Sequence, residues 1–162
     1  MKLRTFDQQD YHQLIQWIVS AEINYMWGGP AFTYPLDTEQ IHIHCQQSQI
    51  FPFLFTCSDS KLGYVELYQE SCDHFRICRV FIAGDHRGQG LAKQMLLQLI
   101  DKAVNTFNAK QVSLAVFDHN HAAKACYLSL GFEVSSTEKG LRSFNGEPWD
   151  LVIMSKAVRS KV

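Results

Sequence analysis

The sequence lacks a long hydrophobic run and has almost no excess of charge of either sign. Its 162 residues include 15 Lys and Arg against 16 Asp and Glu, which gives a net charge of −1. No apolar run approaches the roughly 18 residues that a membrane span requires. A basic excess that could hold a polyanion is also missing. The composition therefore argues against a membrane protein and against nucleic acid as a partner.

Other features are scarce as well. Five cysteines, an odd number, argue against a disulfide framework and favour reduced thiols. The first residues, Met-Lys-Leu-Arg-Thr-Phe-Asp, contain no apolar segment of the secretory kind. Repeats, low-complexity tracts and Pro- or Gly-rich linkers are lacking. Since 46% of the residues are hydrophobic, the chain can bury a sizeable core. We therefore expect a single cytoplasmic domain over residues 1–162.

The first half of the chain predicts two helices and a meander of strands. Residues 3–6 are typical of a strand, and a helix with Asp10 as its N-cap is expected to follow. Residues 25–34, aromatic and rich in turn formers, predict a loop, and a second helix is expected from Asp37 or Thr38. The strand-like runs after it are residues 50–56, 62–68 and 75–83.

The second half alternates helices with strands. Residues 84–90 form a glycine-containing turn that leads into an amphipathic helix over 91–107, and a strand follows at 112–116. Two strands joined through one helix normally pair in parallel. Asn120 is expected to cap a helix that ends at Gly131, before strands at 132–136 and 149–155. The pattern predicts a three-layer α/β fold with a mixed sheet.

The turn Arg87-Gly-Gln-Gly-Leu-Ala92 lies between a predicted strand and a predicted helix. Backbone N–H groups at such a helix N-terminus can bind phosphate, and glycines let the ligand approach the backbone. Arg87 can add a charge-assisted hydrogen bond. A plain strand-to-helix turn is the alternative. The spacing matches neither the dinucleotide fingerprint nor the Walker pattern, which disfavours a nicotinamide or ATP site.

A second motif, N-x-x-A-x-x-x-Y-x-x-x-G-F, occupies residues 120–132. With R-x-x-G-x-A at 87–92 and the strand Val80-Phe-Ile82, it makes the chain resemble the GNAT superfamily of acetyl-CoA-dependent N-acyltransferases. The resemblance extends more weakly over about residues 62–155, and residues 1–60 share only the order of elements. It implies a GNAT-like fold, a central sheet of about six or seven strands with helices on both faces, and acetyl-CoA as co-substrate.

The resemblance implies a position for each part of CoA. The pyrophosphate would bind the backbone of Arg87, Gly88, Gln89, Gly90, Leu91 and Ala92. Pantetheine would pair with the backbone of Phe81 and Ile82, and further contacts would come from Asn120, Lys124 and Tyr127. Asn120 is equally interpreted as a helix cap, and Lys124 as a solvated side chain.

The resemblance also implies that Tyr127 protonates the departing CoA sulfur, since a tyrosine with its ordinary pKa near 10 is protonated at pH 7. A half-buried aromatic residue is the alternative. Glu66 is the candidate base for the amine proton, because it alternates with Tyr64 and Tyr68 on one strand face. The alternative is a solvated surface carboxylate. Weaker candidates for the base are Asp73, His74 and His119, and Arg79 is a candidate ion-pair partner.

Other chemistries find little support. His42 and His44, two residues apart on a predicted helix, point to different faces, and with Cys45 they do not complete a metal ligand set. We assign no metal. Cys126 lies beside Tyr127, but a buried helix cysteine mostly behaves as a small hydrophobe, and no Ser-His-Asp signature accompanies it. Direct transfer is therefore favoured over a covalent enzyme intermediate.

The sequence as a whole predicts an N-acetyltransferase that transfers the acetyl group from acetyl-CoA to a primary amine by direct attack. The acceptor is a polyamine or other small amine, or a peptide N-terminus. Residues 144–155 resemble the ending of ribosomal-protein N-terminal and polyamine acetyltransferases. The alternative is a non-catalytic acyl-CoA-binding sensor or interaction module. Residues 27–34 and 142–148 are expected to contact the acceptor or to form a satellite core, and homodimer formation is left open.

Overall fold

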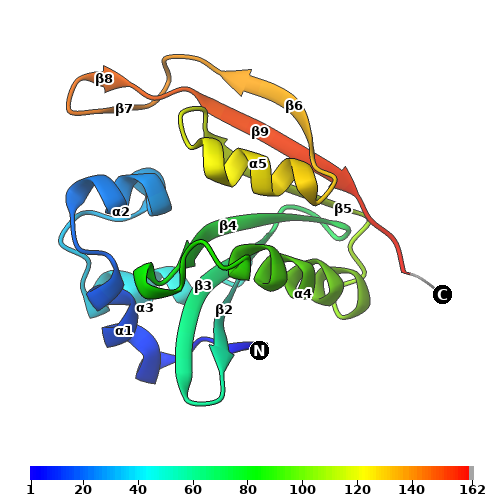
Figure 1. Cartoon of the computed structure of the whole chain (residues 1–162), viewed down its shortest axis with the longest axis horizontal. Helices are drawn as coiled ribbons and strands as arrows, with labels where there is room; N and C mark the ends of the chain where they lie inside the picture. The colour runs from blue at the N-terminus through cyan, green and yellow to red at the C-terminus, as the bar shows by residue number, and fades with distance from the viewer. Residues whose placement is uncertain (161–162) are drawn as a thin grey trace. The chain divides into compact units, whose positions relative to one another are not determined.

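The computed structural model describes residues 1–160 and contains a seven-stranded sheet in the order β1-β2-β3-β4-β5-β9-β6 (Figure 1). The strands are β1 (Lys2–Thr5), β2 (Ile50–Cys57), β3 (Ser60–Gln69), β4 (His74–Ile82), β5 (Gln111–Phe117), β6 (Glu133–Glu138), β7 (Ser143–Phe144), β8 (Glu147–Pro148) and β9 (Leu151–Ala157). β4 and β5 are parallel, whereas β5 and β9 are antiparallel. The predicted α/β class with a mixed sheet is confirmed.

Five α-helices and three short 3-10 turns complete the described part of the chain. The helices are α1 (Tyr11–Trp17), α2 (Ala21–Gly28), α3 (Thr38–Cys45), α4 (Leu91–Asn105) and α5 (His121–Ser129). The turns are η1 (Gln8–Asp10), η2 (Gly29–Ala31) and η3 (Gly84–His86). No helix within residues 1–160 is both long and apolar enough to cross a membrane.

The chain forms two compact units. The first unit contains Met1–Tyr68 and Cys78–Ala92, and the second contains Gln69–Ile77 and the described residues from Lys93 onwards. The chain passes from one unit to the other at the end of β3, inside β4 and near the start of α4. The single domain expected from the sequence stays a prediction.

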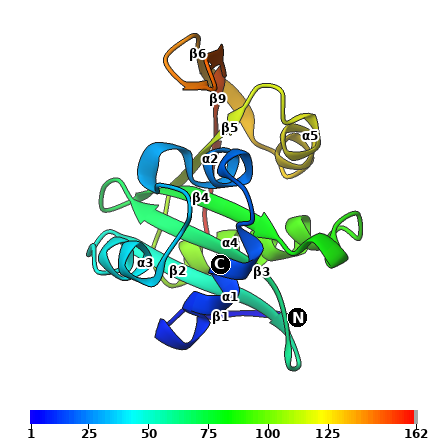
Figure 2. The same cartoon turned by 90° about the vertical axis from the view of Figure 1, so that its left-hand side faces the viewer.

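The first unit is built around one apolar cluster. Asp37 caps α3 by accepting a hydrogen bond from the Gln40 N–H at 2.9 Å, as the sequence predicts. α3 packs against β2 and α1 (Figure 2). Burying one large apolar side chain stabilises a fold by about 1.5–3 kcal/mol. The buried cluster contains Phe6, Tyr11, Leu14, Ile18, Trp27, Phe32, Leu36, Ile41, Leu54, Tyr64 and Phe81.

The loop expected over residues 25–34 is wrong in its first part, because α2 continues to Gly28. The start signal lies upstream of the aromatic residues, where the Ser20 hydroxyl accepts a hydrogen bond from the Ile23 N–H at 3.1 Å. Trp27 in the last turn stacks on Phe32, with ring centroids 5.3 Å apart. Both rings are buried in the apolar cluster of the first unit, so they belong to its core and not to a separate satellite.

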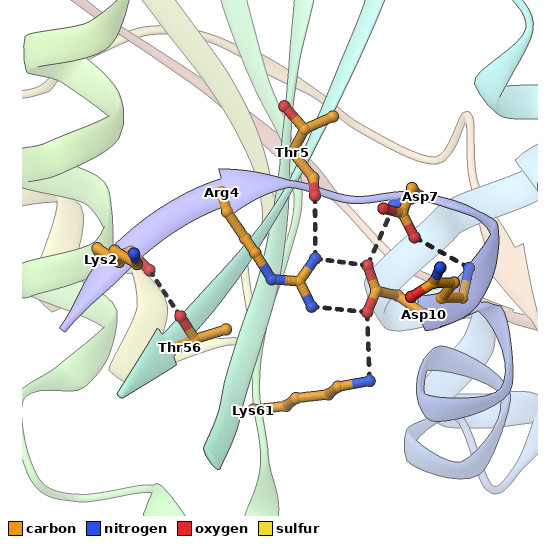
Figure 3. A network of polar contacts seen from close by, with 8 residues as sticks. Lys2, Arg4, Thr5, Asp7, Asp10, Thr56 and Lys61 are labelled. Atoms are coloured by element: carbon orange, nitrogen blue, oxygen red, sulfur yellow. Dashed lines mark hydrogen bonds and ion pairs between the residues drawn. The ribbon is translucent and has the colours of Figure 1, made fainter. Parts of the chain in front are cut away.

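Asp10 does not cap α1 with its side chain, contrary to expectation. Asp7 instead caps η1, and the Asp10 carboxylate accepts a hydrogen bond from the Asp7 N–H at 3.1 Å. Arg4 donates two hydrogen bonds of 2.8 Å to the same carboxylate, and the Lys61 ammonium lies 3.2 Å from it (Figure 3). Through its ion pairs with Arg4 of β1 and Lys61 of β3, the buried Asp10 connects η1 to both strands.

The balance of forces on Asp10 favours the ionised form. Burial raises the pKa of this carboxyl. The hydrogen bonds from Arg4, Asp7 and Lys61 lower the pKa by a larger amount, so the net pKa lies below the ordinary value. A depressed pKa means that folding stabilises the charged form. This contribution is complete above the pKa of the unfolded chain, near 3.9, and is lost as the pH falls through the lower folded pKa.

The second unit contains the predicted amphipathic helix and the strands around it. α4 buries Met95, Leu96, Leu99 and Ala103 on one side and exposes Lys93, Gln94, Leu97 and Asp101 on the other. β4 and β5 pair over His74–Ile77 and Gln111–Leu114. β9 lies between β5 and β6 in the strand order. The hairpin β7–β8 turns at Asn145 and Gly146, which both have positive φ.

We expect the substitution Asp10→Asn to lower the free energy of unfolding at pH 7 by about 1–3 kcal/mol, because Arg4 and Lys61 lose a charged partner. Both cations keep access to water, which limits the loss. Urea unfolding followed by circular dichroism measures the difference. It should shrink when the pH falls below about 4, where the wild-type carboxyl also becomes protonated. A difference independent of pH between 7 and 3 would contradict the ionic role.

Candidate active site

The glycine turn lies in the first unit, between β4 and α4. Gly88 and Gly90 have φ of 78° and 75°, values that suit glycine, and residues 87–90 are exposed. Within residues 1–160, the backbone N–H groups of Gly88, Gln89 and Gly90 have no hydrogen-bond acceptor. A Cβ added at either glycine would meet no atom within 4 Å. The turn therefore presents free N–H groups in open space at the start of a helix, which suits an anion.

Arg87 anchors this turn to the end of β4. Its Nε donates to the Ile82 carbonyl at 2.9 Å, and its guanidinium carbon lies 5.1 Å from the centre of the Phe81 ring. Both strand residues are buried. The Arg87 side chain thus has a structural task beside the phosphate contact that the resemblance implies.

Tyr127 lies in the last turn of α5, in the second unit. The Phe132 N–H donates to the Tyr127 carbonyl at 3.1 Å, and the Gly131 N–H donates to the Leu128 carbonyl at 3.0 Å. Gly131 has φ of 93°. These features define a Schellman motif, in which the residue after the glycine packs on the last helical turn. The rings of Phe132 and Tyr127 accordingly meet edge to face, 6.3 Å apart.

The hydroxyl of Tyr127 has no hydrogen-bond partner within the described part of the chain. The side chain is 7% exposed. Burial, and to a smaller extent the neighbouring Cys126, raises the pKa of Tyr127 well above the ordinary value. The phenol is therefore protonated at pH 7, and its proton is not committed to another residue.

Asn120 and Lys124 both have structural partners near the start of α5. The Asn120 side chain accepts a hydrogen bond from the Ala123 N–H at 3.4 Å, so the predicted cap is confirmed. The Lys124 ammonium donates to Asp118 at 2.7 Å. Lys124 is therefore held by a carboxylate in this structure, and a phosphate contact would compete with that ion pair. The CoA contacts of both residues stay predictions.

Glu66 lies on β3 in the first unit and is completely buried. Its carboxylate contacts three side chains: His44 Nε2 at 2.9 and 3.0 Å, Arg79 at 2.8 Å and the Tyr64 hydroxyl at 2.5 Å. The alternative of a solvated surface carboxylate is wrong. The expected role of Arg79 as an ion-pair partner is confirmed. His44 was missed, although its spacing from the buried Ile41 places it on the inner face of α3.

The three partners decide the charge of Glu66. Burial raises its pKa, but the hydrogen bond from His44 and the charge of Arg79 lower it more, so the net pKa is below the ordinary value. A carboxylate with a depressed pKa and shared oxygens is a weak proton acceptor. Its position as an ion-pair centre is thus clear, while its role as a base stays a prediction.

The remaining candidates have other contacts. His74 Nε2 lies 2.8 Å from the Ser113 hydroxyl, and the Asp73 carbonyl accepts the Lys110 and Gln111 N–H groups. The His119 ring lies against Trp149, with centroids 4.5 Å apart. No group of three or more metal-ligating side chains occurs within residues 1–160. None of the five cysteines forms a disulfide within the described residues.

Comparison with known proteins identifies the family. The profile of the acetyltransferase (GNAT) family matches residues 11–132, about three quarters of the chain, and includes both motifs. The chain belongs to the GNAT acetyltransferase family. This confirms the resemblance that the two motifs indicate.

GNAT relatives are also found among curated proteins and solved structures. The chain is 35% identical over 69 residues to the spermine/spermidine N(1)-acetyltransferase of Bacillus subtilis, a match that spans 43% of each protein. Spermidine N-acetyltransferase from Vibrio cholerae, solved with CoA and spermine, superposes with a TM-score of 0.83 at 20% identity and covers 96% of this chain and 94% of its own. The ribosomal-protein-S18-alanine N-acetyltransferase of Escherichia coli gives 0.78 at 17% identity, with 99% and 96% covered. These two structures confirm the GNAT-like fold.

We expect Glu66→Gln to destabilise the first unit strongly, by about 3–5 kcal/mol at pH 7, because a buried Arg79 loses its counter-charge. The matched control is Glu70→Gln, which removes a more exposed pair with Arg76 and should cost less than about 1 kcal/mol. Denaturant unfolding measures both variants. Equal, small losses would show that the Glu66 ion pairs contribute little.

Proposed function

We propose that the protein is an acetyl-CoA-dependent N-acetyltransferase whose acceptor is a primary amine of the polyamine class. The observation that carries the proposal is the exposed turn at residues 87–90, with its three N–H groups free of acceptors in the described chain, inside the segment that matches the GNAT family. The turn and the family together favour CoA over other anions, because a pyrophosphate fits a row of backbone donors at a helix start.

Each part of CoA then has a proposed contact. The pyrophosphate binds the N–H groups of Gly88, Gln89 and Gly90, with Leu91 and Ala92 completing the helix start. Pantetheine pairs with the backbone at Phe81 and Ile82. Asn120 and Lys124 add contacts from the α5 end. These assignments rest on the family motifs, and the open space at both glycines supports them.

The reaction is a direct transfer. The neutral amine nitrogen attacks the thioester carbonyl carbon, the new C–N bond forms, and the C–S bond breaks when the intermediate collapses. Tyr127 gives its phenolic proton to the sulfur as the thiolate leaves. Its protonated, unengaged hydroxyl supports this role. The nitrogen, which carries a positive charge after the attack, loses one proton to water or to the base, and the tyrosinate takes up a proton from solvent after the products depart.

Polyamines are favoured as acceptors because two curated relatives that match this chain are named for spermine or spermidine. A polyamine nitrogen with a pKa near 10.4 needs about 4.6 kcal/mol to lose its proton at pH 7, whereas a peptide α-amino group near 8 needs about 1.4. A polyamine enzyme therefore gains more from a base. Glu66 is the candidate, and Glu66→Gln should flatten the acidic limb of the pH profile of kcat if it accepts this proton. An unchanged limb would leave it a structural ion pair.

The cofactor contact is tested by ligand stabilisation. Acetyl-CoA at 100 times its Kd should raise the stability of the wild-type protein by about 2.7 kcal/mol. Gly90→Val should gain far less, because valine disfavours the φ of 75° on which the turn depends. The control is Gly84→Ala in the same segment, where φ is not in the left-handed region and the added methyl group meets no atom within 4 Å. Calorimetry that detects no CoA binding to wild type would refute the proposal.

The acid role of Tyr127 is tested by Tyr127→Phe. We expect kcat with spermidine to fall roughly 10²-fold, while the Kd for CoA changes much less, since the pyrophosphate contacts are retained. Single-turnover measurements give the rate of acetyl transfer itself, separate from product release. Full activity under those conditions would assign the proton to water instead, and a change confined to KM would make Tyr127 a binding residue.

A further inference from the structure

Lys156 on β9 is a half-buried lysine whose ammonium group reaches the end of α5. Its Nζ donates a hydrogen bond of 2.6 Å to the carbonyl of Leu130, the C-cap residue of the helix. The two backbone bonds of the Schellman motif serve the carbonyls of Tyr127 and Leu128. Lys156 therefore satisfies a carbonyl that the motif leaves open.

The contact pairs the lysine cation with a neutral carbonyl acceptor. No carboxylate lies within ion-pair distance of Lys156 in the described part of the chain. Partial burial of a charge without a counter-charge costs free energy. A cation at a helix C-terminus also interacts favourably with the helix dipole. Within the described residues, the ammonium group of Lys156 therefore contacts the carbonyl end of α5 and no carboxylate.

The lysine stem lies beside Gly131. A Cβ built on Gly131 would lie 3.4 Å from Lys156 Nζ and 3.6 Å from its Cε. The glycine of the Y-x-x-x-G-F motif is therefore needed for its positive φ, while the lysine stem lies in ordinary contact with this position. The lysine hydrogen bond thus ties the last turn of α5 to β9.

We propose that Lys156 is a positioning residue for Tyr127, and this inference rests on the proposed function. Tyr127 is the residue whose carbonyl receives the closing hydrogen bond of the Schellman motif, three positions before the carbonyl that Lys156 holds. The ammonium fixes this turn against the sheet, so the phenol keeps one orientation toward the sulfur. Loss of the cation lets the turn move without removing any group that contacts CoA.

The test is a double-mutant cycle of Lys156→Met and Tyr127→Phe, with kcat for spermidine, CoA affinity and Tm measured for each variant. Lys156→Met should lower kcat about tenfold and change the Kd for CoA by less than about twofold. In the Tyr127→Phe background it should change kcat by less than about twofold, because the group that it positions is gone. Lys156→Arg, which keeps a cation, should recover most of the activity. Lys139→Met, at an exposed lysine of the same unit, is the matched control.

Two outcomes would overturn the inference. An equal loss of kcat from Lys156→Met in both backgrounds would indicate a general structural role. A lower Tm with unchanged kcat would show a helix cap and nothing more. Failure of the proposed function is recognised separately, because Tyr127→Phe alone would then leave single-turnover rates unchanged, whatever residue 156 is.

Discussion

The hydrogen bond from the Phe132 N–H to the Tyr127 carbonyl is the constraint on which the candidate acid depends. It closes α5, requires the left-handed conformation at Gly131 and brings the Phe132 ring against the tyrosine. A phenol on a frayed helix end would sample many directions, whereas this one is buried and has a single ring contact of defined geometry. In this motif the glycine and the phenylalanine determine the backbone geometry of the helix end, and the tyrosine supplies the candidate acid.

The first unit depends on buried charge in the same way. Glu66 has no exposed surface and is stabilised by an arginine, a histidine and a tyrosine from three different elements. Removing one partner would leave an uncompensated charge, so the cluster fixes α3 and β4 relative to β3 inside this unit. The same contacts that give Glu66 its depressed pKa reduce its strength as a base. The ion pairs that stabilise this carboxylate thus oppose the proposed role of Glu66 as a base.

The sequence predicted what depends on local spacing. The α3 cap at Asp37, the amphipathic α4, the Asn120 cap and the glycine after α5 follow from residues a few positions apart, and the structure confirms them. The partners of Glu66 and Asp10 could not be predicted, because His44 is 22 positions from Glu66 and Lys61 is 51 positions from Asp10. α2 was missed because its aromatic residues are also typical of loops. Lys156 is 26 positions from Leu130, so no spacing rule connects them.

A competition experiment tests the central claim most directly. The protein is mixed with acetyl-CoA carrying a ¹³C-labelled acetyl group, with spermidine and with a peptide that begins with alanine at equal concentration, and the products are identified by mass spectrometry. We predict labelled N-acetylspermidine in excess over labelled peptide. Labelled peptide alone would contradict the polyamine assignment. Absence of any acetylated product from a protein that binds CoA would contradict the catalytic one.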